Sequence, residues 1–317
     1  MHPALSVIFF TVVSGCGYGL LFLLGVILLA YPALLGEEAA ILLVLGALAS
    51  GAGLISSMFH LGQPQRAWRA FSQWRSSWLS REGVAASLSF LPVGALLVAQ
   101  WQHIDASIVR VLAAALATLA VVTVYCTAQI YASLKTIRAW HNAWVVPGYL
   151  LFALLGGTAW LCALHPLLGS GMPGLQWSVL ALAIASAALK LAYWRYIDMQ
   201  SLPATTESAT GLGRLGTARS AEAPHSEENY LTREMGFILA RKHSARLRRI
   251  VLVLFAPLPI VLLLIAIFFP ALAWLLCPFA AAAITTGLFV ERWLFFAEAK
   301  HVVMLYYGSR DPQPQRS

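Results

Sequence analysis

The chain has 317 residues, of which 60% are hydrophobic and only 11% are charged. Soluble domains carry about 25% charged residues, so this composition excludes a soluble globular protein and indicates an integral membrane protein. Lys and Arg outnumber Asp and Glu by 21 to 13, a net charge of +8; in a membrane protein this excess is explained by charges that set topology and meet anionic headgroups, without nucleic-acid binding.

Eight apolar stretches are long enough to cross a bilayer, which takes about 20 mostly apolar residues in a helix. They occupy residues 5–30, 39–59, 83–101, 107–130, 144–165, 177–194, 250–269 and 271–292. Their apolar residues are continuous and do not alternate with a period of two, which favours helices over barrel strands. The first stretch is too long, and too poor in preceding positive charge, for a cleaved signal peptide. The sequence therefore predicts an all-α integral membrane fold, an eight-transmembrane-helix bundle with both termini on the same side.

The basic residues fall almost entirely on one side of this predicted bundle. All Lys and Arg residues except Arg110 fall on that side. They lie in the segments 60–81, 132–142 and 195–249 and in the residues from 292 onward, and Lys190 stands near the same end of the sixth span. The opposite side carries the acidic residues Glu37, Glu38 and Asp105. The positive-inside rule therefore places both termini and the basic connections in the cytoplasm.

Tryptophans stand near many of the predicted span ends, as in the aromatic belt at a membrane–water interface. They are Trp74, Trp78, Trp101, Trp140, Trp144, Trp177, Trp194 and Trp293. We expect these rings to lie at headgroup level.

Two membrane parts are separated by one long polar insertion. Residues 1–199 hold the first six spans and residues 250–307 the last two, while the tail 308–317 is expected to be disordered. The insertion 200–249 begins as a Gly/Pro-punctuated linker and becomes basic and amphipathic from about residue 230. Its second part is typical of a helix that lies in the headgroup plane or docks on a partner protein, and both alternatives stay open.

The chain has no evident ligands for a redox centre of its own. A transmembrane b-type haem needs two axial His ligands within spans, whereas the eight histidines stand at span ends, in connections or in terminal segments. The four cysteines are isolated within spans, without CxxC spacing, so they predict no iron–sulfur or zinc site and are expected to be small buried apolar residues. We therefore expect no cofactor held by this chain's own ligands.

The most informative polar stretch is residues 57–83. His60 ends the second span, and Arg81 and Glu82 stand where the third begins. Ionisable groups at membrane depth are costly and by default indicate a functional site. A second interpretation stays open, in which Ser80 caps the third helix and Glu82 interacts favourably with its dipole.

Other polar residues are predicted at the same membrane edge. The end of the eighth span adds Glu291 and Arg292, and the fourth span adds Tyr125, Gln129 and Tyr131. Most such residues form ordinary interfacial salt bridges. Carboxylates, an imidazole and aromatic rings together are nevertheless what a quinone head requires, because its ring stacks, its carbonyls accept hydrogen bonds and its protons need a relay.

At these residues the sequence resembles the DMSO reductase anchor subunit (DmsC) family. The resemblance rests on the segments MFHLGQPQRA, SWLSRE, YCTAQIYASLKTIRAWH and ERWLFFAEAKHVVM and extends over essentially the whole chain. It implies a haem-free anchor in the bacterial inner membrane, which holds a molybdopterin catalytic subunit and an iron–sulfur subunit with 4Fe-4S clusters. It also implies electron exchange with the quinone pool, through menaquinone or ubiquinone as an exchangeable substrate.

The resemblance also implies roles for particular residues. The family's His and Glu of the HLG and LSxE motifs are implicated in quinol binding, and they match His60 and Glu82. We expect Glu82 to carry a proton, His60 to hydrogen-bond a quinone oxygen and Arg81 to tune Glu82, with Glu291 and Arg292 as secondary candidates. The family includes anchors of cytoplasmic sulfite-oxidising enzymes, and partners docked on the basic side would be cytoplasmic and favour that type. Exported catalytic subunits would instead require docking on the opposite, nearly chargeless face. The expected docking residues are Arg66, Arg69, Arg75, Lys135 and Arg138.

Two other functions are weighed against a quinone-reactive anchor. A secondary transporter requires polar residues and broken helices near the bilayer midplane, usually in repeated halves, and the predicted spans carry little charge there. A structural tether without a quinone site is the second alternative, and a quinone-binding measurement separates it from the anchor.

Overall fold

The structure is a computed structural model that describes residues 4–59, 63–102, 104–168, 174–200, 205–218 and 239–302. Within these ranges the chain is helical, and its one isolated β-bridge joins Ile137 to His301. Eight helices in the described ranges are long and apolar enough to cross a membrane, which confirms the predicted number of spans. His60, the amphipathic stretch before residue 239 and the tail 308–317 lie outside the described residues.

The eight spans follow one another as single or broken helices. They are α1 (Leu5–Phe9), η1 (Phe10–Ser14) and α2 (Gly15–Ala30) as the first span, then α3 (Glu37–Met58), α4 (Trp78–Gln102), α5 (Ala106–Ala132), α6 (Val145–Leu167), α7 (Leu175–Asp198), α10 (Leu239–Phe255) with α11 (Pro257–Phe268), and α12 (Ala273–Ala297). The connections hold short helices: η2 (Pro32–Leu34), η3 (Pro64–Gln73), α8 (Thr206–Thr210), η4 (Leu212–Arg214) and η5 (Pro270–Leu272).

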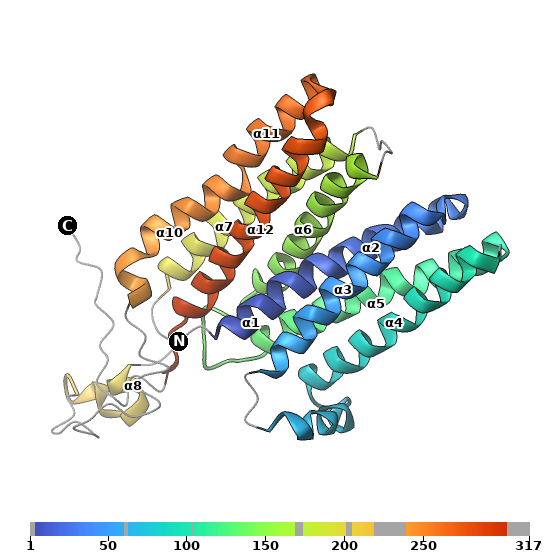
Figure 1. The fold of residues 1–317 in the computed structure, drawn as a ribbon. Coiled ribbons are helices and arrows are strands. Elements are labelled where there is room, and N and C mark those ends of the chain that lie inside the picture. The colour runs from blue at the N-terminus through green and yellow to red at the C-terminus, as the bar shows by residue number, and fades with distance from the viewer. Residues whose placement is uncertain are drawn as a thin grey trace.

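The spans form two groups of four, which are distinct in Figure 1. The first group runs from α1 to α5, and the second comprises α6, α7, α10–α11 and α12. The groups meet chiefly where α2 packs against α6, while α2 also packs against α3 and α5 of its own group. The first span is therefore the central helix of the bundle.

Glycines allow α2 and α6 to cross with their backbones in contact. A Cβ atom on Gly19 would lie 1.9 Å from the carbonyl oxygen of Ala153, and one on Gly157 would lie 2.2 Å from the carbonyl carbon of Gly19. Small residues permit such close approach between membrane helices. The junction between the two groups therefore depends on the absence of a side chain at these positions.

The first span is not a regular α-helix, since residues Phe10–Ser14 form a π-helical turn. Two hydroxyls bond to backbone carbonyls there: Ser14 donates to Phe10 over 2.6 Å, and Thr11 approaches the carbonyl of Val7 at 3.0 Å. π-Helical turns within α-helices occur frequently at functional sites, and this one lies beside the residues discussed below.

Two helix starts differ from those expected. The third span begins at Trp78, five residues before the expected residue 83, so Glu82 lies inside the helix. The seventh span begins by Leu239, and its helix continues through the expected boundary at residue 249. The helix of this span is interrupted at Ala256, between α10 and α11. The cause is Pro257, which lacks an N–H group and disfavours the helical conformation in the residue before it.

Two tryptophans expected at the interface are in fact buried. Trp140 and Trp194 are each only 4% exposed, whereas Trp101 and Trp177 are well exposed. The Trp140 indole donates to the carbonyl of Phe295 over 2.9 Å and stacks on the Phe295 ring. The connection 133–144 therefore packs onto the end of α12 by means of this ring.

Candidate functional site

Glu82 is a buried residue of the third span, not a helix cap. The carbonyl of Ser77 accepts from the N–H of Arg81 over 3.1 Å, and its hydroxyl accepts from the N–H of Ser80 over 3.4 Å, so Ser77 occupies the N-cap position. The interpretation of Ser80 as the cap is therefore wrong. Glu82 is the fifth residue of α4, about 6 Å along the axis from its start, and its side chain is 3% exposed.

Thr127 of α5 is the hydrogen-bond partner of Glu82. Its hydroxyl contacts Oε1 of Glu82 and also lies 3.0 Å from the carbonyl oxygen of Thr123. A hydroxyl has one proton to donate and can also accept. Thr127 can thus donate to a Glu82 carboxylate, or donate to Thr123 and accept from a protonated Glu82. The pair accommodates both protonation states, and among the described residues Glu82 has no cationic partner.

The side chain of Arg81 makes different contacts from those of its neighbour Glu82. Its guanidinium donates to the carbonyls of Trp74 and Arg75, over 3.0 and 2.7 Å, and lies 4.3 Å from the centroid of the Trp78 ring. These contacts hold the connection after η3 against the start of α4. The structure does not bring the Arg81 guanidinium into an ion pair with Glu82.

Aromatic and amide groups lie on the outer side of the same helix pair. The rings of Trp78 and Tyr125 meet edge to face at 5.8 Å, and the Gln129 amide donates to the Tyr125 hydroxyl over 2.9 Å. Phe71 of η3 covers α4 next to Glu82, since a Cβ on Gly83 would lie 3.4 Å from its ring. Rings and polar groups of the kinds that bind quinone heads thus surround the Glu82 end of α4 and α5.

A second buried charge cluster joins α7 and α12. Nζ of Lys190 lies 2.5 Å from Oε1 of Glu291, and Nε of Arg292 lies 3.1 Å from Oε2 of the same carboxylate. All three side chains are buried. With both cations charged the cluster carries a net charge of +1, because one carboxylate faces two cations.

The sequence pattern did not predict Lys190 as a partner of Glu291. Lys190 stands within an apolar stretch and is two turns from the end of α7, but its charge is explained equally well by its nearness to a span end. An ionisable residue inside a span is expected to pair with another, and that rule is the signal that could have found it. The structure brings Lys190, Glu291 and Arg292 together but leaves Glu82 outside their ion pairs.

Aromatic rings enclose this second cluster. The Arg292 guanidinium carbon lies 3.8 Å from the centroid of Tyr149, and Lys190 Nζ lies 4.0 Å from that of Tyr193. Tyr149 in turn stacks on Tyr131 at 5.8 Å. Cation–π contacts are stronger when desolvated, so these rings help to hold two cations away from water.

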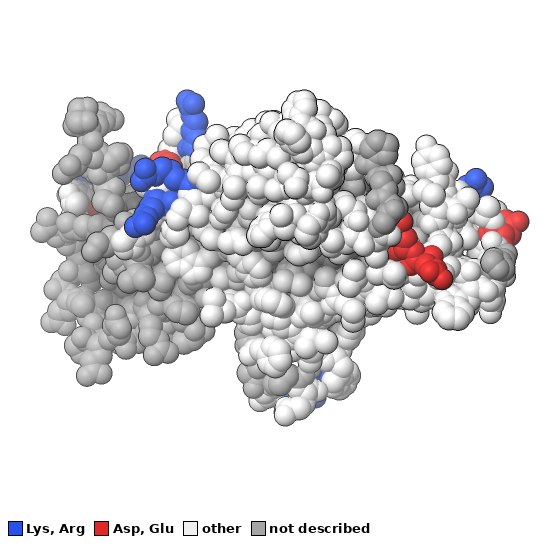
Figure 2. All heavy atoms as spheres, turned by 45° about the horizontal axis from the view of Figure 1, so that its top comes forward, with Lys and Arg blue, Asp and Glu red and all other residues white. Residues whose placement is uncertain are grey.

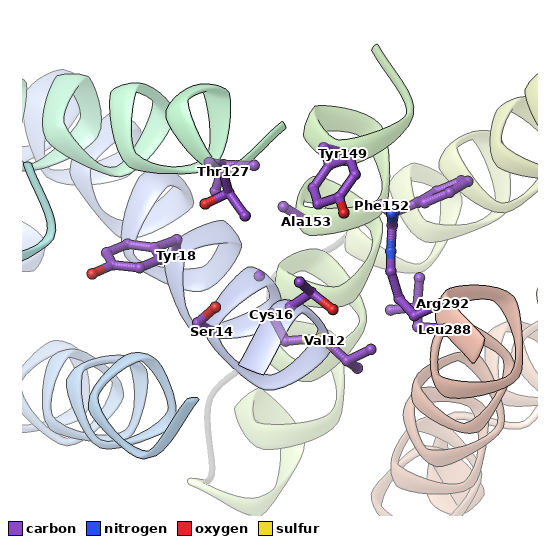
Figure 3. A pocket seen from close by; sticks show the side chains of 13 residues that line it. Val12, Ser14, Cys16, Tyr18, Thr127, Tyr149, Phe152, Ala153, Leu288 and Arg292 are labelled. Atoms are coloured by element: carbon purple, nitrogen blue, oxygen red, sulfur yellow. The ribbon is translucent and has the colours of Figure 1, made fainter. Parts of the chain in front are cut away.

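One cavity, hereafter the central cavity, lies where helices of the two groups meet (Figure 3). Its volume is about 20 Å³, and its lining comes from η1, α2, α5, α6 and α12. Thr127, the partner of Glu82, lies on one wall, while Tyr149 and Arg292 lie on another. A polar cavity above about 10–15 Å³ holds a water molecule, so this space has the size of one water and is too small for a quinone ring.

The expected docking residues lie mainly on the surface. Arg66 and Arg69 of η3 and Arg75 after it are exposed, as is Lys135, whereas Arg138 is half-buried. Arg69 and Arg75 lie over exposed tryptophan rings, Trp68 and Trp74. In Figure 2 the visible basic side chains gather mostly toward one end of the molecule, and acidic side chains stand at the other.

A third ionic cluster clamps α7, α10 and α12 together near the surface. Arg248 donates to Asp198 over 2.5 and 2.9 Å and to Glu298 over 2.8 Å. Burial raises the pKa of the Glu298 carboxyl, and the nearby Arg248 opposes that shift. The basic residue Arg248 thus serves helix packing, a role that the amphipathic pattern did not predict.

One further polar contact lies at the opposite end of the spans. His165, near the end of α6, places Nδ1 2.8 Å from Oε1 of Glu38 at the start of α3. The sequence located both residues at span ends but gave no reason to pair them.

The burial of the cysteines agrees with what the sequence indicated. All four cysteines are buried and free, as expected for small apolar residues. Within the described residues, no group of three or more His, Cys, Asp or Glu side chains is placed to hold a metal ion.

Known proteins are similar to this chain over most of its length. The family model of the DMSO reductase anchor subunit (DmsC) matches residues 1–297. A sulfite dehydrogenase subunit of Allochromatium vinosum is 32% identical over 332 aligned positions, covering 98% of this chain and 99% of that protein. A component of the anaerobic dimethyl sulfoxide reductase of Escherichia coli is 30% identical over 109 positions, 34% of this chain and 38% of that protein. The anaerobic dimethyl sulfoxide reductase component YnfH, from the same organism, is 32% identical over equal shares.

Proposed function

The chain belongs to the DMSO reductase anchor subunit (DmsC) family, and from this premise we propose that it exchanges electrons and protons with quinone beside Glu82. It is a multi-pass membrane anchor subunit. In this proposal the anchor holds an iron–sulfur subunit and a molybdopterin catalytic subunit at the bacterial inner membrane. The iron–sulfur subunit exchanges electrons with a quinone bound by this chain.

The observation that carries the proposal is a buried carboxyl with no cation beside it among the described residues. Glu82 is enclosed between α4 and α5 within about 6 Å of the helix start, and Thr127 is its hydrogen-bond partner. A carboxyl that serves only structure is normally paired when it is buried. Glu291 is paired in that way with Lys190 and Arg292, so Glu82 is the better candidate for proton exchange.

The chemistry divides between this chain and its partners. Reduction of a quinone to a quinol adds two electrons, which the partner's 4Fe-4S clusters supply, and two protons, which come from water. Glu82 gives a proton to a quinone oxygen and is reprotonated from the aqueous side, and quinol oxidation uses the same steps in reverse. Trp78, Tyr125 and Gln129 offer ring faces and polar contacts for the quinone head, and His60 is proposed to donate to its second oxygen.

We assign the partners to the cytoplasmic side. The positive-inside rule puts the basic connections there, and these carry the exposed Arg66, Arg69, Arg75 and Lys135. The relative with the widest coverage is named a sulfite dehydrogenase subunit, so we propose sulfite oxidation by the partner enzyme and electron flow toward quinone. The half-buried Arg138 is the weakest of the proposed docking residues.

Transport is the less favoured alternative. Among the described residues, the buried side chains of Glu82, Lys190, Glu291 and Arg292 lie within about two turns of helix ends at one end of the bundle. A substrate path across the membrane calls for polar groups near the midplane. The clustering at one end supports exchange with a molecule that enters from the lipid near one surface.

The test is Glu82→Gln in the intact complex, with turnover measured by a short-chain quinone and by an artificial dye. A positioned acid or base contributes about 10²–10⁴-fold in rate, so quinone-coupled turnover should fall by about 100-fold or more while dye turnover persists. Glu82→Asp, which keeps the carboxyl, should retain part of the quinone activity.

Normal quinone kinetics in Glu82→Gln would refute the assignment. Failure of the purified wild-type complex to bind a fluorescent quinone analogue would leave only the structural tether.

A further inference from the structure

The exposed face of α7 ends in an arginine at the basic end of the bundle. Along this helix, exposed residues recur every three or four positions and therefore share one face. They are Trp177, Ala181, Ile184, Ala188, Leu191 and Arg195. The rise from Trp177 to Arg195 is about 27 Å at 1.5 Å per residue, close to the thickness of the hydrocarbon layer of a bilayer, about 30 Å. Arg195 therefore stands where this apolar face leaves the hydrocarbon.

The next span presents two arginines in the same way. The exposed residues that share a face within α10, and then within α11, are Arg246, Arg249 and Val253, followed by Val261, Ile265 and Phe268. The rise from Arg249 to Phe268 is about 29 Å, so Arg249 also stands at the hydrocarbon boundary, and Arg246 lies nearly one turn closer to water. The described part of the basic segment is thus the end of a spanning helix and does not lie in the headgroup plane.

Arg248 differs from the two arginines beside it because it faces the bundle. Its guanidinium donates to Asp198 of α7 and to Glu298, which follows α12. Arg246 and Arg249 form no ion pair and no side-chain hydrogen bond within the described part of the chain. One face of α10 therefore serves helix packing, while the opposite face carries two uncompensated cations.

The exposed arginines of the two spans belong to one surface. α7 and α10 lie side by side in Figure 1, and the contact between Asp198 and Arg248 joins their ends. Arg195 stands nearly one turn before Asp198 on α7 and is unpaired among the described residues. With Glu298 included, four arginines and two carboxylates meet at these ends, a net charge of +2. Both carboxylates are already compensated by Arg248, so this surface attracts an anion.

The anion that fits this surface is the headgroup of a phospholipid. A phosphodiester carries its negative charge at the hydrocarbon boundary, and a guanidinium binds phosphate oxygens through paired N–H donors. The residues that we assign to partner docking, Arg66, Arg69 and Arg75, belong to a connection between spans. Arg195 and Arg249 instead end faces that continue along the apolar sides of their helices. This continuity with a lipid-facing surface favours a lipid over a protein partner.

We propose that Arg195, Arg246 and Arg249 bind the headgroup of an anionic phospholipid, whose acyl chains lie against the exposed apolar faces of α7 and α10. Arg248 holds the two helices together and compensates the nearby carboxylates, so the three outer arginines stay available for phosphate. The site is separate from Glu82, and the inference does not depend on quinone binding there.

The test is a lipid titration of the purified complex in detergent, in which native mass spectrometry counts the bound lipids. The probes are phosphatidylglycerol, which is anionic, and phosphatidylcholine with the same acyl chains, which is zwitterionic. Each arginine near an anionic headgroup contributes about fivefold in affinity, equivalent to about 1 kcal/mol. The double variant Arg246→Gln/Arg249→Gln should therefore bind phosphatidylglycerol about 25-fold more weakly, with unchanged binding of phosphatidylcholine.

The matched control is Arg110→Gln/Arg214→Gln. It removes two arginines that are also exposed but lie on neither of these faces, and it should keep the affinity of the wild type for phosphatidylglycerol. An equal loss in both double variants would assign the effect to total charge and overturn the site. Unchanged phosphatidylglycerol binding in Arg246→Gln/Arg249→Gln would overturn it as well.

Two further outcomes would identify a different ligand. If inorganic phosphate at equal concentration displaces phosphatidylglycerol from the wild-type complex, the arginines bind a free anion and the lipid site is refuted. If Arg246→Gln/Arg249→Gln loses the partner subunits during purification, the arginines belong to the docking surface, which also refutes it.

Arg195→Gln keeps the test valid if the double variant does not assemble. This change lies on α7, and it should weaken phosphatidylglycerol binding about fivefold without affecting phosphatidylcholine. The comparison of the two lipids on the wild-type complex needs no variant at all, and equal affinity for both would contradict an anionic headgroup site.

Discussion

Glu82 and Glu291 are buried carboxylates near the same end of the bundle, yet their surroundings differ. Glu82 belongs to the first helix group and has a threonine hydroxyl as its partner. Glu291 belongs to the second group and faces Lys190 and Arg292 within 2.5 and 3.1 Å. A charge at Glu291 is compensated at all times, whereas a charge at Glu82 is not. Burial alone therefore does not identify a functional carboxyl, and the presence or absence of a paired cation does.

The largest difference between the two carboxyls should appear in stability. Glu291→Gln leaves two buried cations without a counter-charge, and breaking a buried pair in this way costs about 3–5 kcal/mol. Glu82→Gln removes no ion pair and should leave the thermal unfolding temperature nearly unchanged. Unfolding of the purified complexes, followed by tryptophan fluorescence, provides the comparison. The distinction between the two carboxyls fails if Glu82→Gln proves the less stable variant.

The junction between the helix groups offers a second test, because the central cavity lies against it. Gly19→Ala places a Cβ 1.9 Å from the Ala153 carbonyl oxygen, and such overpacking costs about 1–3 kcal/mol. Gly94→Ala, which meets nothing within 4 Å, should be neutral or slightly stabilising, since Ala is the better helix former. Unfolding temperatures of the two variants settle this, and equal values would contradict the close crossing of α2 and α6.

The hydroxyl of Thr127, the hydrogen-bond partner of Glu82, provides a further test of the difference between the two carboxyls. Thr127→Val keeps the shape but removes the hydroxyl, a net stability loss of about 1 kcal/mol. Quinone-coupled turnover should fall further than stability suggests, because Glu82 loses the hydroxyl that bonds to it in either protonation state, and Thr127→Ser should restore it. The ratio of quinone to dye turnover is the readout. Full activity in Thr127→Val would show that Glu82 works without this hydroxyl.

The smallest effect is expected at Asp198, the exposed member of the ionic cluster around Arg248, because water also solvates its charge. Asp198 is more than half exposed, and exposed pairs contribute about 0–1 kcal/mol, so Asp198→Asn should reduce stability only slightly. Arg248→Met should cost more, because it also leaves the Glu298 carboxyl, whose side chain is 9% exposed, without its cation. The pKa of Glu298 is raised by burial. Its contribution to stability is therefore greatest below its ordinary pKa and falls as pH rises.

Without Arg248 the pKa of Glu298 rises further, and the fall with increasing pH should be steeper. Unfolding temperatures measured across the acid to neutral range check the sign. An Arg248→Met variant that gained stability as the pH rose would contradict burial as the cause of the raised pKa of Glu298.

The number of membrane spans follows largely from composition, whereas the contacts between side chains of different helices largely do not. Eight apolar stretches predicted eight spans because length and hydropathy fix what can cross a bilayer, and the motif residues predicted the family. The start of α4 was placed five residues late because the segment before Gly83 is polar, although Ser77 could serve as a cap. The Lys190–Glu291 pair was missed since pairing across more than a hundred residues depends on helix packing. Trp140 was misplaced because tryptophan suits an interface and a protein core equally well.

The central claim is that quinone is bound at the Glu82 end of α4 and α5. A photoreactive azidoquinone, bound to the intact complex and competed by excess quinone, tests it by the position of its covalent label. The account predicts that mass spectrometry finds the competed label on residues near Trp78 or Tyr125. A competed label confined to α7 and α12, or to the partner subunits, would contradict it.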